Sequence, residues 1–261
     1  MIDLHSHLLP GIDDGPASLE HSLELAQAAA QQGTRMLAAT PHLRADFPDV
    51  LPSELAGRCE EMRKALSGAG IDLEVVQGGE AGLMWAVHAD DEALRAGSYG
   101  GRGTDLLIES PYGGLTTTFE QLLQTVADRG FRLLLAHPEN NPTFQKDPGR
   151  LRALVERGVL LQVTARSLIL RDRRRGPRPL AEALVRDGHA HVLASDAHSG
   201  YELRPPALGA GVSAAAELVG AERARWLVTD APAAILAGVP LPEPPPVESR
   251  RRGLLGRLRR A

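Results

Sequence analysis

The chain contains little cysteine and few aromatic residues. Cys59 is the only cysteine among 261 residues, which excludes an internal disulfide and fits a reducing compartment. Aromatic residues make up 3% of the chain, so aliphatic side chains must form most of the core. No apolar run approaches the roughly 20 residues that span a bilayer, and the N-terminus lacks the basic and apolar regions of a signal peptide. We therefore expect a cytoplasmic protein without a transmembrane segment.

Basic charge is also scarce outside the C-terminus. Residues 248–261 contain six arginines and one glutamate, a net charge of +5, so residues 1–247 carry −9 when the whole chain carries −4. An acidic body argues against nucleic acid as a partner, because nucleic-acid binding requires a basic surface.

Histidine and carboxylate side chains follow the segments that resemble buried strands. The N-terminus alternates like a strand and ends in His5 and His7, which share a face because they are two residues apart. Five later segments run into similar residues. They are Thr34–Thr40 before His42, Leu73–Gly79 before Glu80, Asp105–Ile108 before Glu109, Arg132–Ala136 before His137, and His191–Ser195 before Asp196 and His198.

These segments also indicate the fold. With Val159–Thr164 they make seven apolar runs separated by helical patterns, which is typical of buried parallel strands. Ser18 and Ser53 are expected to cap two of the intervening helices. We predict an α/β fold, a distorted (β/α)7 barrel with its site at the C-terminal ends of the strands. Residues 1–238 form the domain, and residues 239–261 form a proline-rich linker and a basic tail.

The ligand-type residues suit a multinuclear metal site. Nine candidates exceed what one tetrahedral zinc ion uses. Imidazole and carboxylate ligands without thiolate suit two or three divalent ions such as manganese, iron or zinc. The candidates are His5, His7, Asp14, His42, Glu80, Glu109, His137, Asp196 and His198, and Asp13 is an alternative to Asp14.

The same residues belong to motifs with a family resemblance. HSH, DDGP, ATPH, GGE, LIE, HPE and SDAH, in this order, resemble the polymerase and histidinol phosphatase (PHP) superfamily. MIDLHSH, QVTARSL and SDAHSGYELRPP resemble its bacterial protein-tyrosine phosphatase branch, the CpsB/CapC type of capsule and exopolysaccharide regulation. The resemblance covers residues 1–238 and implies a PHP barrel with three metal positions. The implied ligand sets are His5, His7, Glu80 and Asp196; Glu80, Glu109 and His137; and Asp14, His42 and His198.

The resemblance also implies how phosphate is bound. Arg204 matches a family arginine that is expected to contact phosphate. The family usually has arginine where this chain has Asn140, which carries no charge. Either Arg44 or Arg166 supplies the missing cation, or the affinity for phosphate is lower. Guanidinium groups can hold phosphate oxygens in a bidentate fashion.

These observations predict an enzyme that hydrolyses phosphotyrosine with a metal-activated hydroxide. Its implied partner is a membrane-bound bacterial tyrosine kinase. The alternatives are a small-molecule phosphatase of the histidinol-phosphate type and a metal-binding regulatory protein with weak turnover. A cysteine-dependent phosphatase needs an arginine six residues after its cysteine, and Ala65 stands there.

The C-terminal tail has two interpretations. Five prolines within Pro240–Pro246 predict an extended spacer. The arginine- and leucine-rich residues 250–260 are either a solvated, disordered tail or a peripheral contact with the anionic inner face of the membrane.

Overall fold

The computed structural model describes residues 1–172, 174–201 and 204–248. The basic tail from residue 250 onward therefore lies outside the described residues. The strands are β1 (Ile2–Ser6), β2 (Met36–Ala39), β3 (His42–Leu43), β4 (Glu74–Gln77), β5 (Glu80–Gly82), β6 (Asp105–Glu109), β7 (Arg132–Ala136), β8 (Leu160–Thr164) and β9 (Val192–Ala194). The α-helices are α1 (Leu19–Gln31), α2 (Leu55–Gly68), α3 (Leu83–His88), α4 (Asp91–Gly97), α5 (Phe119–Ala127), α6 (Pro142–Lys146), α7 (Gly149–Glu156), α8 (Ala165–Ile169), α9 (Arg178–Arg186), α10 (Leu208–Val219), α11 (Ala221–Trp226) and α12 (Asp230–Ala237).

The strands pair in parallel as two sheets that continue into one another. One sheet has the order β1-β2-β4 and the other β3-β5-β6-β7-β8-β9. Two residues separate β2 from β3, and two separate β4 from β5. Across these gaps Gly78 N donates to Ala39 O at 3.0 Å and Glu80 N donates to Pro41 O at 3.0 Å. The predicted strands at 34–40 and 73–79 are therefore the first halves of two broken strands.

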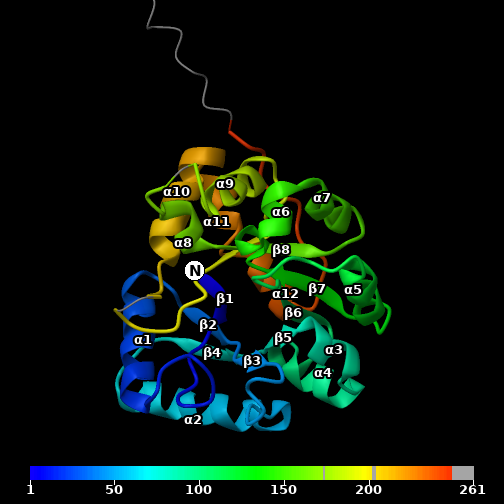
Figure 1. The fold of residues 1–261 in the computed structure, drawn as a ribbon. Coiled ribbons are helices and arrows are strands. Elements are labelled where there is room, and N and C mark those ends of the chain that lie inside the picture. The colour runs from blue at the N-terminus through cyan, green and yellow to red at the C-terminus, as the bar shows by residue number, and fades with distance from the viewer. Residues whose placement is uncertain (173, 202–203, 249–261) are drawn as a thin grey trace, which may run out of the picture.

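The ring of strands closes between β1 and the end of β9. Ser6 and Ala197 form an isolated parallel bridge, and Asp196 N donates to His5 O at 2.9 Å. Counting each broken strand once, the described residues contain seven strand positions around this ring. Most of the helices surround the strands, and α12 lies in the middle of this view among the strands (Figure 1). The predicted α/β fold is thus confirmed.

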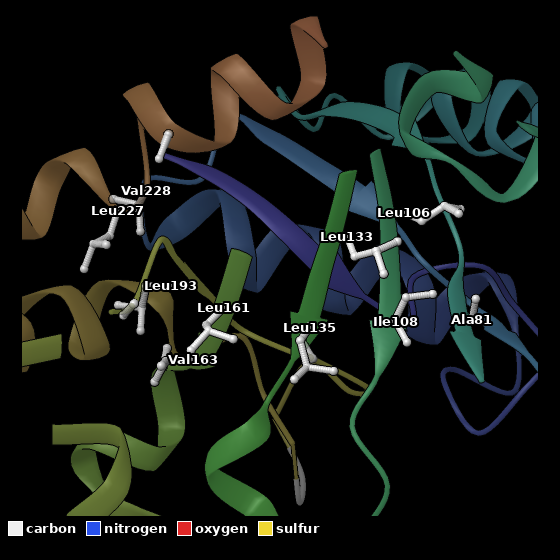
Figure 2. Packing of buried hydrophobic residues seen from close by; sticks show 14 of the residues in the cluster. Ala81, Leu106, Ile108, Leu133, Leu135, Leu161, Val163, Leu193, Leu227 and Val228 are labelled. Carbon is white, nitrogen blue, oxygen red and sulfur yellow. The ribbon is translucent and has the colours of Figure 1, made fainter. Parts of the chain in front are cut away.

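The barrel has separate apolar packing on its two sides, as strand alternation requires. Leu133 and Leu135 of β7 belong to the large cluster that the helices cover, part of which Figure 2 shows. Leu134 of the same strand belongs to a smaller cluster with Leu107 and Leu160. This smaller cluster occupies the barrel interior, because the register aligns Leu107, Leu134 and Leu160 across β6, β7 and β8.

Two helix starts test the capping expectations. Ser18 is the N-cap of α1 and accepts a hydrogen bond from His21 N at 3.4 Å, as predicted. The expectation for Ser53 was wrong: it lies within a 3₁₀ turn, Pro52–Glu54, and Glu54 precedes α2 without a side-chain cap. Pro52 at the first position of this turn sets a helical φ before the serine can act as a cap.

The C-terminal segment follows the domain surface without helix or strand. Arg223 Nη1 donates to Pro245 O at 3.0 Å, and Glu248 N donates to Val219 O at 3.1 Å. Within the described residues, the helices are all too short or too polar to cross a bilayer.

Candidate metal centre

The nine predicted ligand residues meet at the C-terminal end of the barrel. Their ligand atoms form four overlapping groups, within each of which all atoms lie within 4.8 Å of one another. The groups are His7, Asp14, His42 and His198; His5, His7 and Asp196; His5, Glu80 and His137; and His42, Glu80 and Glu109. Each group combines strand ends that are distant in sequence, so only the closed ring of strands can assemble it.

Glu80 lies at the centre of the cluster. Its Oε1 is 2.8 Å from His137 Nε2, and its Oε2 is 3.0 Å from His42 Nδ1. The same Oε2 lies 3.4 Å from His5 Nε2 and 3.5 Å from His7 Nε2. The carboxylate is buried, and its two oxygens face different imidazoles. This geometry suits a carboxylate that bridges two cations.

A β-bulge in β1 helps to direct the first two histidines. Asp3 pairs with Leu37 and Ser6 pairs with Ala39, so β1 has one more residue than β2 in this interval. Bulges redirect side chains and are frequent beside active sites. His5 and His7 both reach Glu80, with ring centroids 5.5 Å apart.

The structure distinguishes the two adjacent aspartates of the DDGP motif. Asp14 Oδ1 lies 3.2 Å from His198 Nε2 and 3.4 Å from His42 Nε2, so its carboxylate faces the cluster. Asp13 Oδ2 instead accepts hydrogen bonds from His7 Nδ1 at 2.6 Å and His42 N at 3.1 Å. Asp14 is therefore the candidate ligand of the two. Asp13 fixes the orientation of His7, as carboxylates beside metal-binding histidines commonly do.

Gly15 allows the DDGP loop to lie against β1. A Cβ atom at this position would lie 2.8 Å from His7 Cβ and even closer to His7 O. Real Cβ atoms do not approach that closely, so a larger residue would displace the loop that carries Asp13 and Asp14.

Two ligands occupy unusual backbone conformations. His137 has φ 35° and Asp196 has φ 54°, and they are the two non-glycine residues with positive φ in the described part of the chain. This region is disfavoured for residues with a Cβ atom and is found mainly where function requires it. The chain turns sharply as β7 and β9 end, and His137 Nε2 then lies 2.8 Å from Glu80 Oε1 while Asp196 Oδ1 lies 3.4 Å from His5 Nε2.

Sequence reasoning missed three buried polar residues that support the ligands. Gln162 Oε1 accepts a hydrogen bond from His5 Nδ1 at 2.9 Å. Asp3 Oδ1 accepts from Ser195 N at 3.0 Å, which joins β1 to the end of β9. Glu139 Oε1 accepts from Thr164 N at 2.8 Å and from the Ser167 hydroxyl at 2.9 Å. Polar residues within otherwise apolar strands, such as Asp3 and Gln162, were the available signal.

Opposite charges dominate the electrostatics of the cluster. Burial alone would lower the pKa of His5, but Glu80 and Asp196 outweigh it and raise that pKa to about 9. Burial would likewise lower the pKa of His42, but hydrogen bonds to Asp14 and Glu80 raise it to about 10. Burial opposes ionisation of Glu80, yet the surrounding histidines hold its pKa well below the usual range. Cations would compete with these protons for the same atoms.

Several polar atoms in the cluster lack protein partners. His5 Nε2, His7 Nε2 and Asp196 Oδ1 are buried without a hydrogen-bond partner among the described residues. Buried polar atoms without partners are costly. A divalent cation would satisfy them, so this donor set fits the predicted metal ions.

Of the residues predicted to bind phosphate, Arg204 and Asn140 line one cavity beside the cluster. The cavity has a volume of about 470 Å³ and also includes Tyr112, Arg166 and Asp196 in its wall. Arg204 Nη2 donates to Asp196 Oδ2 at 2.5 Å, and Nη1 donates to His198 Nε2 at 2.8 Å. A phosphate in this cavity would lie between arginine donors and the ligand cluster.

Arg44, the third predicted phosphate-binding residue, lies on another side of the cluster. Its Nη1 donates to both carboxylate oxygens of Glu109, at 2.6 and 2.8 Å, and its side chain lines a separate cavity. Arg44 and Arg204 thus each pair with a candidate ligand carboxylate, Glu109 and Asp196 respectively, and of the two arginines it is Arg204 that lines the 470 Å³ cavity with Asn140.

Cys59 takes no part in the site. It is buried in α2, and burial raises the pKa of its thiol to about 11. A thiol with such a pKa is a poor nucleophile near neutral pH.

Comparisons with known proteins agree with this geometry. The family model "Capsular polysaccharide synthesis, CpsB/CapC" matches residues 1–237. Tyrosine-protein phosphatase YwqE of Bacillus subtilis (strain 168) is 32% identical over 199 residues, which cover 76% of this chain and 78% of YwqE. Tyrosine-protein phosphatase CpsB of Streptococcus pneumoniae is 24% identical over 247 residues, which cover 90% of this chain and 98% of CpsB.

A solved structure gives a similar result. It comes from work on "YwqE from Bacillus subtilis and CpsB from Streptococcus pneumoniae, unique metal-dependent tyrosine phosphatases". It matches this chain with a TM-score of 0.81 and 28% sequence identity, and covers 95% of this chain and 100% of the other.

Proposed function

Because the chain belongs to the CpsB/CapC family of capsular polysaccharide synthesis, we propose that it is a metal-dependent protein-tyrosine phosphatase. The observation that carries this proposal is the cluster around Glu80 beside a cavity lined by Arg204 and Asn140. The relatives named as tyrosine-protein phosphatases support the same activity.

The cluster suits two or three divalent ions, with manganese as our first choice. The family resemblance assigns Glu80 to two of the ion positions, with His5, His7 and Asp196 at one and with Glu109 and His137 at the other, and the two Glu80 oxygens face His5 and His137. Asp14, His42 and His198 would hold a third. When bound, such ions lower the pKa of water and neutralise phosphate oxygens.

The chain's own residues would bind and orient the substrate. The Arg204 guanidinium would donate charge-assisted hydrogen bonds to phosphate oxygens, and the Asn140 amide would donate an uncharged one. Tyr112 stacks on His137 with ring centroids 5.3 Å apart and lines the cavity, so its ring would flank the phosphotyrosine side chain. Gln162 and Asp13 would hold His5 and His7 in their ligand orientations.

The cellular role is the finer part of the proposal. We propose that the substrate is the phosphorylated form of a bacterial tyrosine kinase that regulates capsule or exopolysaccharide synthesis in the cytoplasm. The family description supports the connection to capsule synthesis. Peripheral contact with anionic membrane through the basic tail would bring the phosphatase to such a kinase.

The direct test is hydrolysis by purified protein with Mn²⁺. We expect release of phosphate from a phosphotyrosine peptide and from p-nitrophenyl phosphate, and no release after treatment with EDTA. Preference for histidinol phosphate over the peptide would support the small-molecule alternative instead. Elemental analysis of the protein should find two or three ions per chain, and one ion or fewer would contradict the multinuclear site.

A further inference from the structure

Three exposed hydrophobic side chains belong to segments that follow the C-terminal ends of strands, the end of the barrel that carries the metal centre. Met84, which is 57% exposed, follows β5, and Tyr112, which is 55% exposed, follows β6. Tyr201, which is 67% exposed, follows β9. Exposed apolar groups that cluster around a site commonly mark contacts with another molecule. Their position suits a polypeptide that crosses the mouth of the site.

One of these side chains, Met84, lines an apolar cleft. A cavity of about 650 Å³ lies between α3 and α5 and includes Leu83, Met84 and Trp85 of α3 and Phe119 and Leu122 of α5. A volume of this size lies within the range of pockets that hold small ligands.

Two contacts link the wall of the α3–α5 cleft to the metal centre. Arg44 lines the cleft while its guanidinium binds both oxygens of the candidate ligand Glu109. Pro111 lines the cleft, and its neighbour Tyr112 lines the phosphate cavity and stacks on His137. The wall of the apolar cleft and the wall of the phosphate cavity are therefore formed in part by two residues that are adjacent in the chain, Pro111 and Tyr112.

We propose that the α3–α5 cleft binds an apolar side chain located within three residues of the phosphotyrosine in the protein substrate. The inference rests on the proposed function and extends it to sequence selectivity. An extended peptide advances about 3.3 Å per residue, so neighbours of a phosphotyrosine held at Arg204 can pass Tyr112 and reach the cleft. The apolar lining favours leucine- or phenylalanine-like side chains over charged ones.

Substrate scanning tests this proposal. In a set of seven-residue phosphotyrosine peptides, leucine replaces serine at each flanking position in turn. With Mn²⁺, leucine at one or more of these positions should raise kcat/KM by about tenfold, as expected for burial of one apolar side chain. Met84→Asp should remove this preference through a higher KM and leave hydrolysis of p-nitrophenyl phosphate unchanged.

A matched control separates cleft binding from a general surface effect. Val239 is 47% exposed and its carbonyl accepts a hydrogen bond from Arg132, at the start of β7 and away from the site. Val239→Asp should leave the leucine preference intact. Hydrolysis of phosphotyrosine peptides without any preference for a flanking residue would overturn the cleft proposal while the proposed function stands. Failure to hydrolyse any phosphotyrosine peptide would overturn the proposed function.

Trp85 provides a readout that does not depend on turnover. The chain has two tryptophans, and Trp226 is buried at the far α11, so Trp226→Phe leaves Trp85 as the only emitter. The probe is the preferred leucine peptide with phosphonomethyl-phenylalanine in place of phosphotyrosine. Saturable change of Trp85 emission, lost when serine replaces leucine, supports the proposal. Binding of the probe without a change in Trp85 emission would overturn the proposal. It would also be overturned if the protein formed a dimer that Met84→Asp dissociates, because a second copy of the chain would then occupy the cleft.

Discussion

The two ends of the barrel treat ionisable groups in opposite ways. At the start of β9, burial, with help from the charges of His189 and Arg223, lowers the pKa of His191 to about 4. At the C-terminal ends, carboxylates raise the pKa of His5 to about 9 and that of His42 to about 10. At the N-terminal end of the strands the His191 imidazole therefore stays neutral. At the C-terminal end charged side chains are brought together, as a metal-binding site requires.

This difference separates stability from function within the same strands. Along β7, Leu134 belongs to the interior cluster, and His137 follows directly after the strand. The apolar residues fix the register that places the ligands. The ligands themselves are buried charged groups, which contribute little to the stability of the fold when no metal ion is bound. Changes at the two ends should therefore affect different measurements.

The largest expected contrast is between Glu80→Ala and Leu134→Ala. Removal of Glu80 should abolish both metal content and phosphatase activity, because its oxygens face four imidazoles. Leu134→Ala should lower the free energy of unfolding by about 2–5 kcal/mol and leave the metal content of the folded protein unchanged. Elemental analysis and urea unfolding measure the two effects. Full metal occupancy in Glu80→Ala would contradict the bridging role.

The next contrast is the pH dependence of stability at the apolar end. The unfolded chain protonates His191 near pH 6.5, and the folded chain does so only near pH 4. The free energy of unfolding should therefore be fully retained above pH 6.5 and fall by about 2–3 kcal/mol as the pH drops toward 4. His191→Gln should show a smaller fall in urea unfolding with EDTA present. Parallel pH profiles for the two proteins would refute the assignment.

Gln162→Leu tests the support of a ligand rather than the ligand itself. Loss of the amide oxygen frees His5 Nδ1, and loss of such a supporting contact typically costs 10- to 100-fold in metal affinity. Titration with Mn²⁺ should reveal this loss, and excess Mn²⁺ should restore activity. Unchanged affinity would mean that packing alone orients His5.

The smallest contrast concerns phosphate. Arg204→Ala should lower kcat/KM by roughly tenfold, the value of one charge-assisted hydrogen bond. The control is Arg174→Ala, because Arg174 is exposed and lines a different cavity. Asn140→Arg should improve phosphate binding if the uncharged amide weakens it. Equal kinetics for Arg204→Ala and Arg174→Ala would remove Arg204 from the phosphate site.

Much of the metal centre follows from local sequence patterns. Apolar runs indicate strands, and six of the seven runs lead into a histidine or carboxylate, as at Arg132–Ala136 and His137, whereas Val159–Thr164 does not. Because parallel strands in a closed barrel bring their C-terminal ends together, this order in sequence is sufficient to predict convergence. The N-cap at Ser18 was also predicted from local sequence and is confirmed. The predicted N-cap at Ser53 was wrong, because Pro52 begins a 3₁₀ turn that includes the serine.

The residue types at the strand ends and the number of strand positions could be predicted from local sequence, since both are read over a few residues. Which of these residues meet depends on the tertiary structure. It turned Asp14 toward His198 and Asp13 toward His7, brought Gln162 to His5, and paired Arg44 with Glu109. Such contacts join residues that the chain separates by up to 184 positions, as for Asp14 and His198. Strand register and loop conformation determine these contacts, and neither can be predicted from a local sequence pattern.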